Sequence, residues 1–269
     1  MNALAARRRH PAAILLLLLL GLLLTGGVYS LVAPKEANAT AAAPADAVAE
    51  GKNLFISNCA SCHGTNAQGT KSGPSLVGVG AAAVDFQVGT GRMPMAKPGV
   101  QAPAVNKVKF SAQQIEAMAA YVASLGAGPS VPDEKYTTAL QPGSAENNER
   151  IARGGEIFRV NCAMCHNFAG AGGALTRGKY APTLEGVSGK HIYEAMVTGP
   201  QSMPVFNDAN LTPEAKQDII SYLNAQQTQT NVGGMTLGNL GPVSEGLFAW
   251  VFGLGFLIVI AIWLGKKAA

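Results

Sequence analysis

Two five-residue motifs constrain this chain more than any other feature of its sequence. They are Cys59-Ala60-Ser61-Cys62-His63 and Cys162-Ala163-Met164-Cys165-His166, and they use all four cysteines of the 269 residues. Two thiols three positions apart on one helical turn can each form a thioether with a haem vinyl group, and the next histidine can ligate the iron. The sequence therefore predicts two covalently bound haems c, held by Cys59, Cys62, Cys162 and Cys165, with His63 and His166 as iron ligands.

Other interpretations of the cysteine pairs fit the sequence less well. Two Cys-x-x-Cys pairs can form a four-thiolate zinc site, but these pairs lie 103 residues apart, and zinc leaves the histidine after each pair unexplained. A thioredoxin-like redox pair is typical of a βαβ pattern, which surrounds neither motif. Haem attachment accounts for the cysteines and the histidines together.

Both ends of the chain carry apolar stretches long enough to cross a membrane. Only 13% of the residues are charged, compared with roughly 25% in a typical soluble domain. Residues 12–33 and 246–264 are uncharged, and each can span a hydrocarbon core of roughly 30 Å as a helix. The first stretch also resembles a signal peptide cleaved near Ala37-Asn38-Ala39, but it is longer than the usual apolar region of such a peptide. We therefore expect a retained anchor.

Basic residues beside these stretches predict their orientation. Arg7, Arg8 and Arg9 precede the first stretch, and Lys266 and Lys267 follow the second. The positive-inside rule places both termini in the cytoplasm, so the chain is expected to be a multi-pass protein of the cell membrane with residues 34–242 on the extracytoplasmic side. This middle segment holds 15 basic and 15 acidic residues, so the net charge of +4 arises at the membrane flanks and does not indicate nucleic-acid binding.

The middle segment contains the same pattern twice, which indicates two modules with a common framework. A phenylalanine precedes each haem motif by four residues. After the motifs, residues 73–79 match 181–187, and residues 90–94 match 198–204 with two extra positions in the second copy. The closing part of each copy, residues 110–122 and 211–223, also matches.

Each module is expected to be a small helical unit. One helix precedes each haem motif and begins near Ala47 or Glu149, and another closes the module after an N-cap at Ser111 or Thr212. Pro213, at the first helical position, supports the second cap. Apolar residues at helical spacing predict that one face of the first closing helix is buried; they are Ile115, Met118, Ala119, Val122 and Leu125.

Two methionines at matched positions are candidates for the sixth iron ligands. Met93 and Met203 each precede a proline and follow a glycine-containing loop. A thioether is a soft, neutral ligand that raises the reduction potential. Both residues can equally be ordinary core methionines. The rival ligands are Met95 in the first module and Met196 and His191 in the second, and His191 would give a lower potential.

The expected fold is all-α, with two tandem cytochrome c-like helical modules flanked by two transmembrane helices. The expected segments are a cytoplasmic flank with a transmembrane helix (1–33), a tether (34–46), module 1 (47–126), a linker (127–146), module 2 (147–226), a second tether (227–242), and a transmembrane helix with a cytoplasmic tail (243–269). The sequence shows no nucleophile–base constellation, Walker motif or dinucleotide fingerprint in a credible setting, so no catalysis is expected from the chain alone.

With these features, the chain resembles the dihaem cytochrome c subunit of the actinobacterial-type cytochrome bc1 (menaquinol–cytochrome c reductase) complex. The resemblance rests on residues 59–64, residues 73–80, the second haem motif and, most distinctively, residues 84–95. It implies a membrane complex with a cytochrome b subunit and a Rieske iron–sulfur subunit. One haem would accept electrons from the Rieske subunit, and the other would pass them to the copper centre of a terminal cytochrome c oxidase.

Three other functions remain open from the sequence. A dihaem cytochrome c subunit of another membrane dehydrogenase or oxidase complex would share most of these features. A dihaem peroxidase needs one iron with an open position, which the matched Met93 and Met203 argue against. A module that only docks partners is the third.

Overall fold

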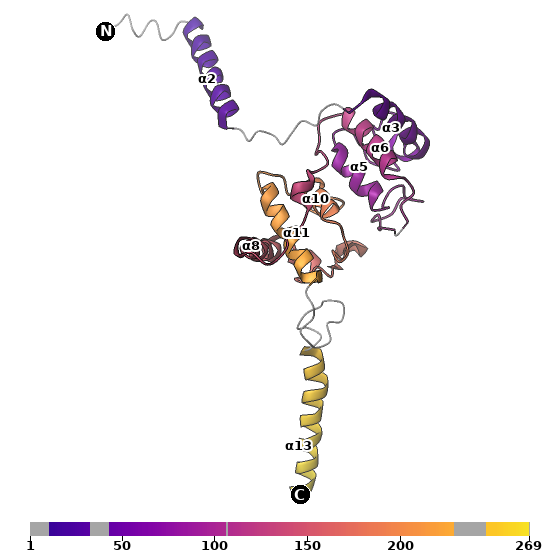
Figure 1. The fold of residues 1–269 in the computed structure, drawn as a ribbon, viewed down its shortest axis with the longest axis vertical. Helices are drawn as coiled ribbons and strands as arrows, with labels where there is room; N and C mark the ends of the chain where they lie inside the picture. Colours follow the sequence, from indigo (N-terminus) through magenta and orange to yellow (C-terminus); the bar gives the residue numbers. More distant parts are fainter. Residues whose placement is uncertain (1–10, 33–42, 106, 229–245, 269) are drawn as a thin grey trace, which may run out of the picture. The chain divides into compact units, whose positions relative to one another are not determined.

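The structure is a computed structural model that describes residues 11–32, 43–105, 107–228 and 246–268. Helices dominate it, and the only sheet among these residues is one pair of two-residue strands. The expected all-α fold, with two helical modules between two membrane-length helices, is confirmed (Figure 1). The arginines at positions 7–9, the candidate cleavage segment 37–39 and most of both tethers lie outside the described residues.

Both membrane-length helices expose their apolar side chains. The first is α2 (Pro11–Val32), and the second combines a π-helical stretch, η2 (Ala249–Leu254), with α13 (Gly255–Ala268). The apolar spans within them, Ala12–Leu31 and Gly246–Lys267, have no buried part. Such helices need an apolar solvent around them, which lipid provides.

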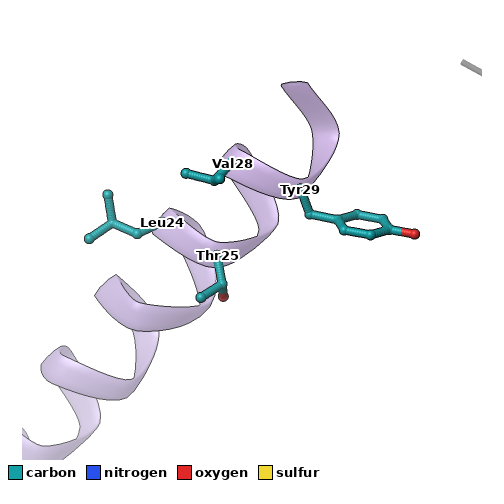
Figure 2. Close-up of a pocket in the computed structure, with 4 residues that line it drawn as sticks. All are labelled: Leu24, Thr25, Val28 and Tyr29. Carbon is teal, nitrogen blue, oxygen red and sulfur yellow. The ribbon is translucent and has the colours of Figure 1, made fainter. Parts of the chain in front are cut away.

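Figure 2 shows the surface of α2 at its last turns. Leu24 and Val28 point outward from one side of the helix, one turn apart, and Tyr29 points away from them. The Thr25 hydroxyl donates a hydrogen bond to the Gly21 carbonyl oxygen at 2.7 Å, so its polar group is paired within the helix. The shallow hollow that these side chains line belongs to a single helix and is apolar, which suits lipid contact rather than a specific ligand.

Module 1 packs two long helices and one shorter helix around a single core. Its helices are α3 (Ala45–Asn58), α4 (Ala60–His63), α5 (Gly80–Gly89) and α6 (Ala112–Ser124). Both α3 and α5 pack against α6 (Figure 1). The predicted apolar face of α6 is confirmed: Ile115, Met118, Ala119 and Val122 are buried in the core, and Leu125 packs at its edge.

Module 2 repeats this plan with two additions, a pair of short strands and a short helix that lies within the expected linker 127–146 and packs against the helices of module 2. Its helices are α7 (Glu134–Thr137), α8 (Ala145–Asn161), α9 (Ala163–His166), α10 (Gly189–Thr198) and α11 (Pro213–Thr228). Helix α8 packs against α11 as α3 packs against α6. Between α9 and α10 the chain forms a small antiparallel pair, β1 (Gly173–Ala174) and β2 (Tyr180–Ala181), joined through a 3-10 turn, η1 (Thr176–Gly178).

The predicted helix caps are present. The Ser111 hydroxyl accepts a hydrogen bond from the Gln114 backbone, and the Gln114 side chain returns one to Ser111, forming a complete capping box. The Thr212 hydroxyl accepts from the Ala215 backbone at 3.3 Å. The helices before the haem motifs begin at Ala45 and Ala145, slightly earlier than expected.

A glycine lets the two long helices of each module cross closely. A Cβ atom on Gly51 would lie 1.9 Å from the Ala117 carbonyl oxygen, and one on Gly154 would lie 1.9 Å from the Asp218 carbonyl oxygen. Beside each crossing, one turn further along both helices, a phenylalanine contacts a tyrosine: the ring centroids lie 5.3 Å apart for Phe55–Tyr121 and 5.6 Å apart for Phe158–Tyr222. The repeat seen in the sequence is thus a repeat of packing.

Candidate haem sites

Each haem motif begins where the first long helix of its module ends. Cys59 terminates α3 and Cys162 terminates α8, and a second short helix starts directly after each of them. The backbone N–H of His63 donates to the Cys59 carbonyl oxygen, and that of His166 donates to Cys162, both at 2.9 Å. One turn therefore carries both thiols and the histidine. All four cysteines are free and partly exposed, so both pairs are available for thioether bonds.

Both histidines have one ring nitrogen engaged in the same way. His63 Nδ1 lies 2.7 Å from the Pro74 carbonyl oxygen, and His166 Nδ1 lies 2.9 Å from that of Pro182. A carbonyl only accepts, so Nδ1 carries the proton and Nε2 keeps its lone pair for a metal. Both rings are buried. This donor set fits haem c in each module.

The backbone turns sharply after each histidine. Gly64 follows His63 with φ of 81°, and Asn167 follows His166 with φ of 65°, both in the left-handed region that glycine and asparagine tolerate best. The turn lets the following loop run back beside the motif, where Gly69 donates to the His63 carbonyl oxygen at 2.8 Å. The loop can then present the prolyl carbonyl to the imidazole.

Burial controls the protonation of these groups. It is the main cause that lowers the pKa of His166, so the imidazole is neutral, the form that ligates a metal. Burial, with a smaller contribution from Cys165, raises the pKa of Cys162 to about 11. Burial likewise raises the pKa of Cys59. Burial thus favours the neutral thiol at Cys59 and Cys162.

Both candidate methionines border the core of their own module. Met93 packs on the same apolar cluster as Cys59, and Met203 packs on the same cluster as Cys162. Backbone hydrogen bonds anchor both loops: Met93 donates to the Gln87 carbonyl oxygen at 2.9 Å, and Met203 donates to that of Pro200 at 3.1 Å. The two methionines are thus placed alike in the two modules.

The rival ligands occupy other places. Met196 is buried inside α10 within the core cluster. His191 turns toward module 1, where its ring meets the Phe86 ring edge-on at 6.2 Å and its Nε2 lies 3.9 Å from Asp85 Oδ2. Met95 is partly exposed and does not belong to the described core cluster of module 1. These placements favour Met93 and Met203.

The two modules touch through residues that the sequence did not single out. Lys190 Nζ of α10 lies 2.7 Å from Asp85 Oδ2 of α5. The Gln101 side chain forms two hydrogen bonds with the backbone of Tyr180, accepting at 2.9 Å and donating at 2.7 Å. Contacts between distant segments leave no periodic pattern in a sequence, so no signal identified them.

Comparison with protein families assigns both modules to cytochrome c. The family described as "Cytochrome c" matches residues 48–126, and the family described as "Cytochrome C oxidase, cbb3-type, subunit III" matches residues 149–223. Each match contains one haem motif and one of the two candidate methionines. The chain therefore carries cytochrome c domains, whose cofactor is haem c.

Curated relatives match almost the whole chain. It is 44% identical over 257 residues to the "Cytochrome bc1 complex cytochrome c subunit" of Corynebacterium efficiens, covering 92% of this chain and 86% of the relative. It is 44% identical over 252 residues to the protein of the same name from Mycobacterium tuberculosis, covering 92% and 88%. A more distant relative, the "Cbb3-type cytochrome c oxidase subunit CcoP" of Azospirillum, is 25% identical over 170 residues, covering 55% and 47%. At this identity and coverage, the chain belongs to the family of cytochrome bc1 complex cytochrome c subunits.

Proposed function

We propose that this chain carries electrons through two haems c, one in each module, from the Rieske iron–sulfur subunit of a cytochrome bc1 complex to a terminal cytochrome c oxidase. The observation that carries the proposal is the repeated geometry of the histidines. His63 and His166 are both buried on a Cys-x-x-Cys turn, with Nδ1 bonded to a prolyl carbonyl and Nε2 left for iron.

The residues of each module have distinct roles in this proposal. Cys59 and Cys62 hold one haem through thioether bonds, and Cys162 and Cys165 hold the other. His63 and His166 are the fifth ligands of the two irons, and Met93 and Met203 are the sixth. Bound haem c supplies reversible one-electron chemistry, and the protein sets its potential through the axial ligands and the apolar surroundings.

Two haems on one anchored chain suit transfer within an assembly, because the carrier need not diffuse. Helix α5 of module 1 packs against α10 of module 2, which supports direct transfer between the modules. The partners in this proposal are the cytochrome b subunit, the Rieske subunit and the oxidase. The quinol–cytochrome c oxidoreductase activity, coupled to proton translocation, belongs to the complex, and this chain contributes electron transfer alone.

The proposed topology has two membrane passes with both termini in the cytoplasm. The anchors lie within residues 1–33 and 243–269, and the tethers are 34–46 and 227–242. Modules 1 and 2 span 47–126 and 147–226 on the extracytoplasmic side, joined by the linker 127–146. Fusing a reporter that is active only in the cytoplasm to either terminus tests this topology. Activity at both ends is expected, and an inactive N-terminal fusion would show the reverse orientation, whereas an active reporter that no longer migrates with the haem modules would show cleavage.

Purification tests the complex directly. The chain, isolated from native membranes in mild detergent, is expected to co-purify with a cytochrome b and a Rieske protein and to hold two haems c per chain by pyridine haemochrome assay. Cys62→Ser is expected to perturb only the haem of module 1, and Cys165→Ser only the haem of module 2. Recovery without cytochrome b and the Rieske protein contradicts the proposal.

A subunit of an oxidase is the second candidate function. It is favoured by the match of residues 149–223 to the cbb3-type oxidase subunit III family and by the partial likeness to an oxidase subunit. Co-purification with oxidase subunits in the absence of cytochrome b would support this alternative over the first proposal.

A further inference from the structure

Three side chains of the kinds that bind metals gather at the contact between the modules, apart from the haem motifs. Asp85 of α5 and His191 and Glu194 of α10 each offer a ligand atom, and these atoms lie within 4.8 Å of one another. His191 Nε2 lies 3.9 Å from Asp85 Oδ2 and 4.0 Å from Glu194 Oε2. Because His191 and Glu194 are three positions apart, they share one face of α10.

Glu194 is the unusual member of this cluster. Its side chain is 0% exposed, and neither carboxylate oxygen has a hydrogen-bond partner among the described residues. Asp85 Oδ2 also lacks a hydrogen bond, although Lys190 Nζ lies 2.7 Å from it. Burying an unpaired carboxylate is costly, so a proton or a cation has to compensate for it.

The repeat shows that the module fold does not require a carboxylate here. The Thr90 hydroxyl donates to the Phe86 carbonyl oxygen, and the Thr198 hydroxyl donates to that of Glu194, so Phe86 and Glu194 occupy equivalent positions. Phe86 is an ordinary buried apolar residue. The carboxylate of Glu194 therefore belongs to the junction of the modules rather than to their common framework.

We propose that Asp85, His191 and Glu194 bind one divalent transition-metal ion, best matched by Zn²⁺, at the junction of the two modules. Two carboxylates and an imidazole, with water in the fourth position, form a donor set typical of zinc. Zinc bonds of about 2.0–2.2 Å place tetrahedral donors roughly 3.4 Å apart, so separations of 3.9 and 4.0 Å need only small side-chain shifts. The ion joins α5 to α10 and ties module 1 to module 2.

The charges facing the cluster are compatible with a bound cation. Arg92 stacks on the Phe86 ring, and Lys190, whose side chain is 43% exposed, can turn toward water when an ion binds Asp85. Burial, followed by a side-chain hydrogen bond with Asp85 and the charge of Asp85, raises the pKa of Glu194 to about 10, whereas the nearby Lys190 lowers it. Burial lowers the pKa of His191, which favours the neutral, metal-binding imidazole.

Zinc content of the haem-loaded complex tests the proposal. The complex is stripped with EDTA, dialysed against Zn²⁺, freed of unbound metal and assayed by mass spectrometry, for the wild type and for Glu194→Gln, Asp85→Asn and Glu185→Gln. Glu185 is an exposed glutamate of the same module and serves as the matched control. We expect Glu194→Gln and Asp85→Asn each to hold one zinc fewer per chain than the wild type and Glu185→Gln, with unchanged haem content.

Equal zinc content in all four proteins overturns the proposal. An infrared band of a neutral carboxylic acid that persists in the zinc-treated wild type and disappears in Glu194→Gln also overturns it, since the compensating partner is then a proton. Lys190→Ala keeps all three ligands and removes the competing cation, which provides a check independent of ligand loss. This variant is expected to bind the junction zinc more tightly than the wild type, and weaker binding contradicts the site.

Discussion

At the scale of single residues, the ring orientation of His63 and His166 is set by hydrogen bonds to backbone carbonyl groups rather than to side chains. Pro74 and Pro182 present carbonyl oxygens to His63 and His166 at 2.7 and 2.9 Å. A carbonyl has no charge to lose, so it fixes the tautomer and the ring orientation over a wide pH range. The same arrangement in both modules means that differences between the two haem potentials must arise mainly elsewhere, in the sixth ligands and the surrounding charges.

The methionine assignment is tested by replacing each candidate with a stronger donor. Met93→His and Met203→His, made singly, are each expected to lower the potential of one haem by on the order of 100 mV, because imidazole stabilises Fe(III) relative to a thioether. Redox titration of the haem-loaded complex measures the shift. Met95→His is the matched control, since Met95 lies outside the described core cluster, and it should leave both potentials unchanged. A shift with Met95→His but not with Met93→His would reverse the assignment in module 1.

A buried carboxylate paired with two arginines at the helix crossing distinguishes module 2 from module 1. Asp218 is fully buried and pairs with Arg150 at 2.8 Å and Arg153 at 2.6 Å, whereas Ala117 occupies the equivalent place in module 1. Asp218→Ala removes the partner of two partly exposed arginines, and we expect it to lower the free energy of unfolding of module 2 by about 1–3 kcal/mol. Denaturation followed by haem absorption measures the loss. Removing the exposed charge of Glu156 on α8, the helix that carries both arginines, should cost far less, and an equal cost would contradict this account.

At the scale of elements, the crossing of the two long helices is the most sensitive packing contact. In Gly154→Ala the new methyl group collides with the Asp218 carbonyl oxygen. This oxygen belongs to the backbone of α11, so it can move aside only if α11 separates from α8. We expect a loss of about 1–3 kcal/mol in the stability of module 2 and reduced haem content there. Thermal unfolding of the haem-loaded protein measures it. Glu149→Ala, at an exposed position of α8, is the control; a stable Gly154→Ala protein would show that the helices cross less closely than described.

The sequence predicted those elements whose signals are local. The caps at Ser111 and Thr212 and the buried face of α6 follow from neighbouring residues alone, and all are present as expected. The β1–β2 pair was not predicted, because two-residue strands carry no alternation. The junction cluster around Glu194 was also missed: a glutamate in a helix ordinarily faces water, and its burial here depends on the tertiary packing of α10.

At the scale of the whole molecule, the contact between modules determines whether two haem domains act as one unit. Gln101 of module 1 pairs with both backbone groups of Tyr180 in module 2. Gln101→Ala removes both hydrogen bonds. We expect the free energy of local opening at Tyr180 to fall by about 1 kcal/mol, which corresponds to roughly fivefold faster hydrogen exchange at the Tyr180 amide. Hydrogen exchange with mass spectrometry on the intact complex measures this rate. Gln113→Ala, at an exposed position of α6, should leave it unchanged, and protection that survives Gln101→Ala would mean that other contacts hold the junction.

The central claim is that electrons pass through both haems of one anchored chain. Its most direct test is quinol-driven oxygen consumption by the purified assembly of the bc1 complex with its oxidase, comparing the wild type with His63→Ala and His166→Ala. We expect either substitution to reduce the rate at least a hundredfold while the Rieske cluster is still reduced by quinol, because each haem is an obligatory step. Oxygen consumption at the wild-type rate with either histidine removed would contradict the account.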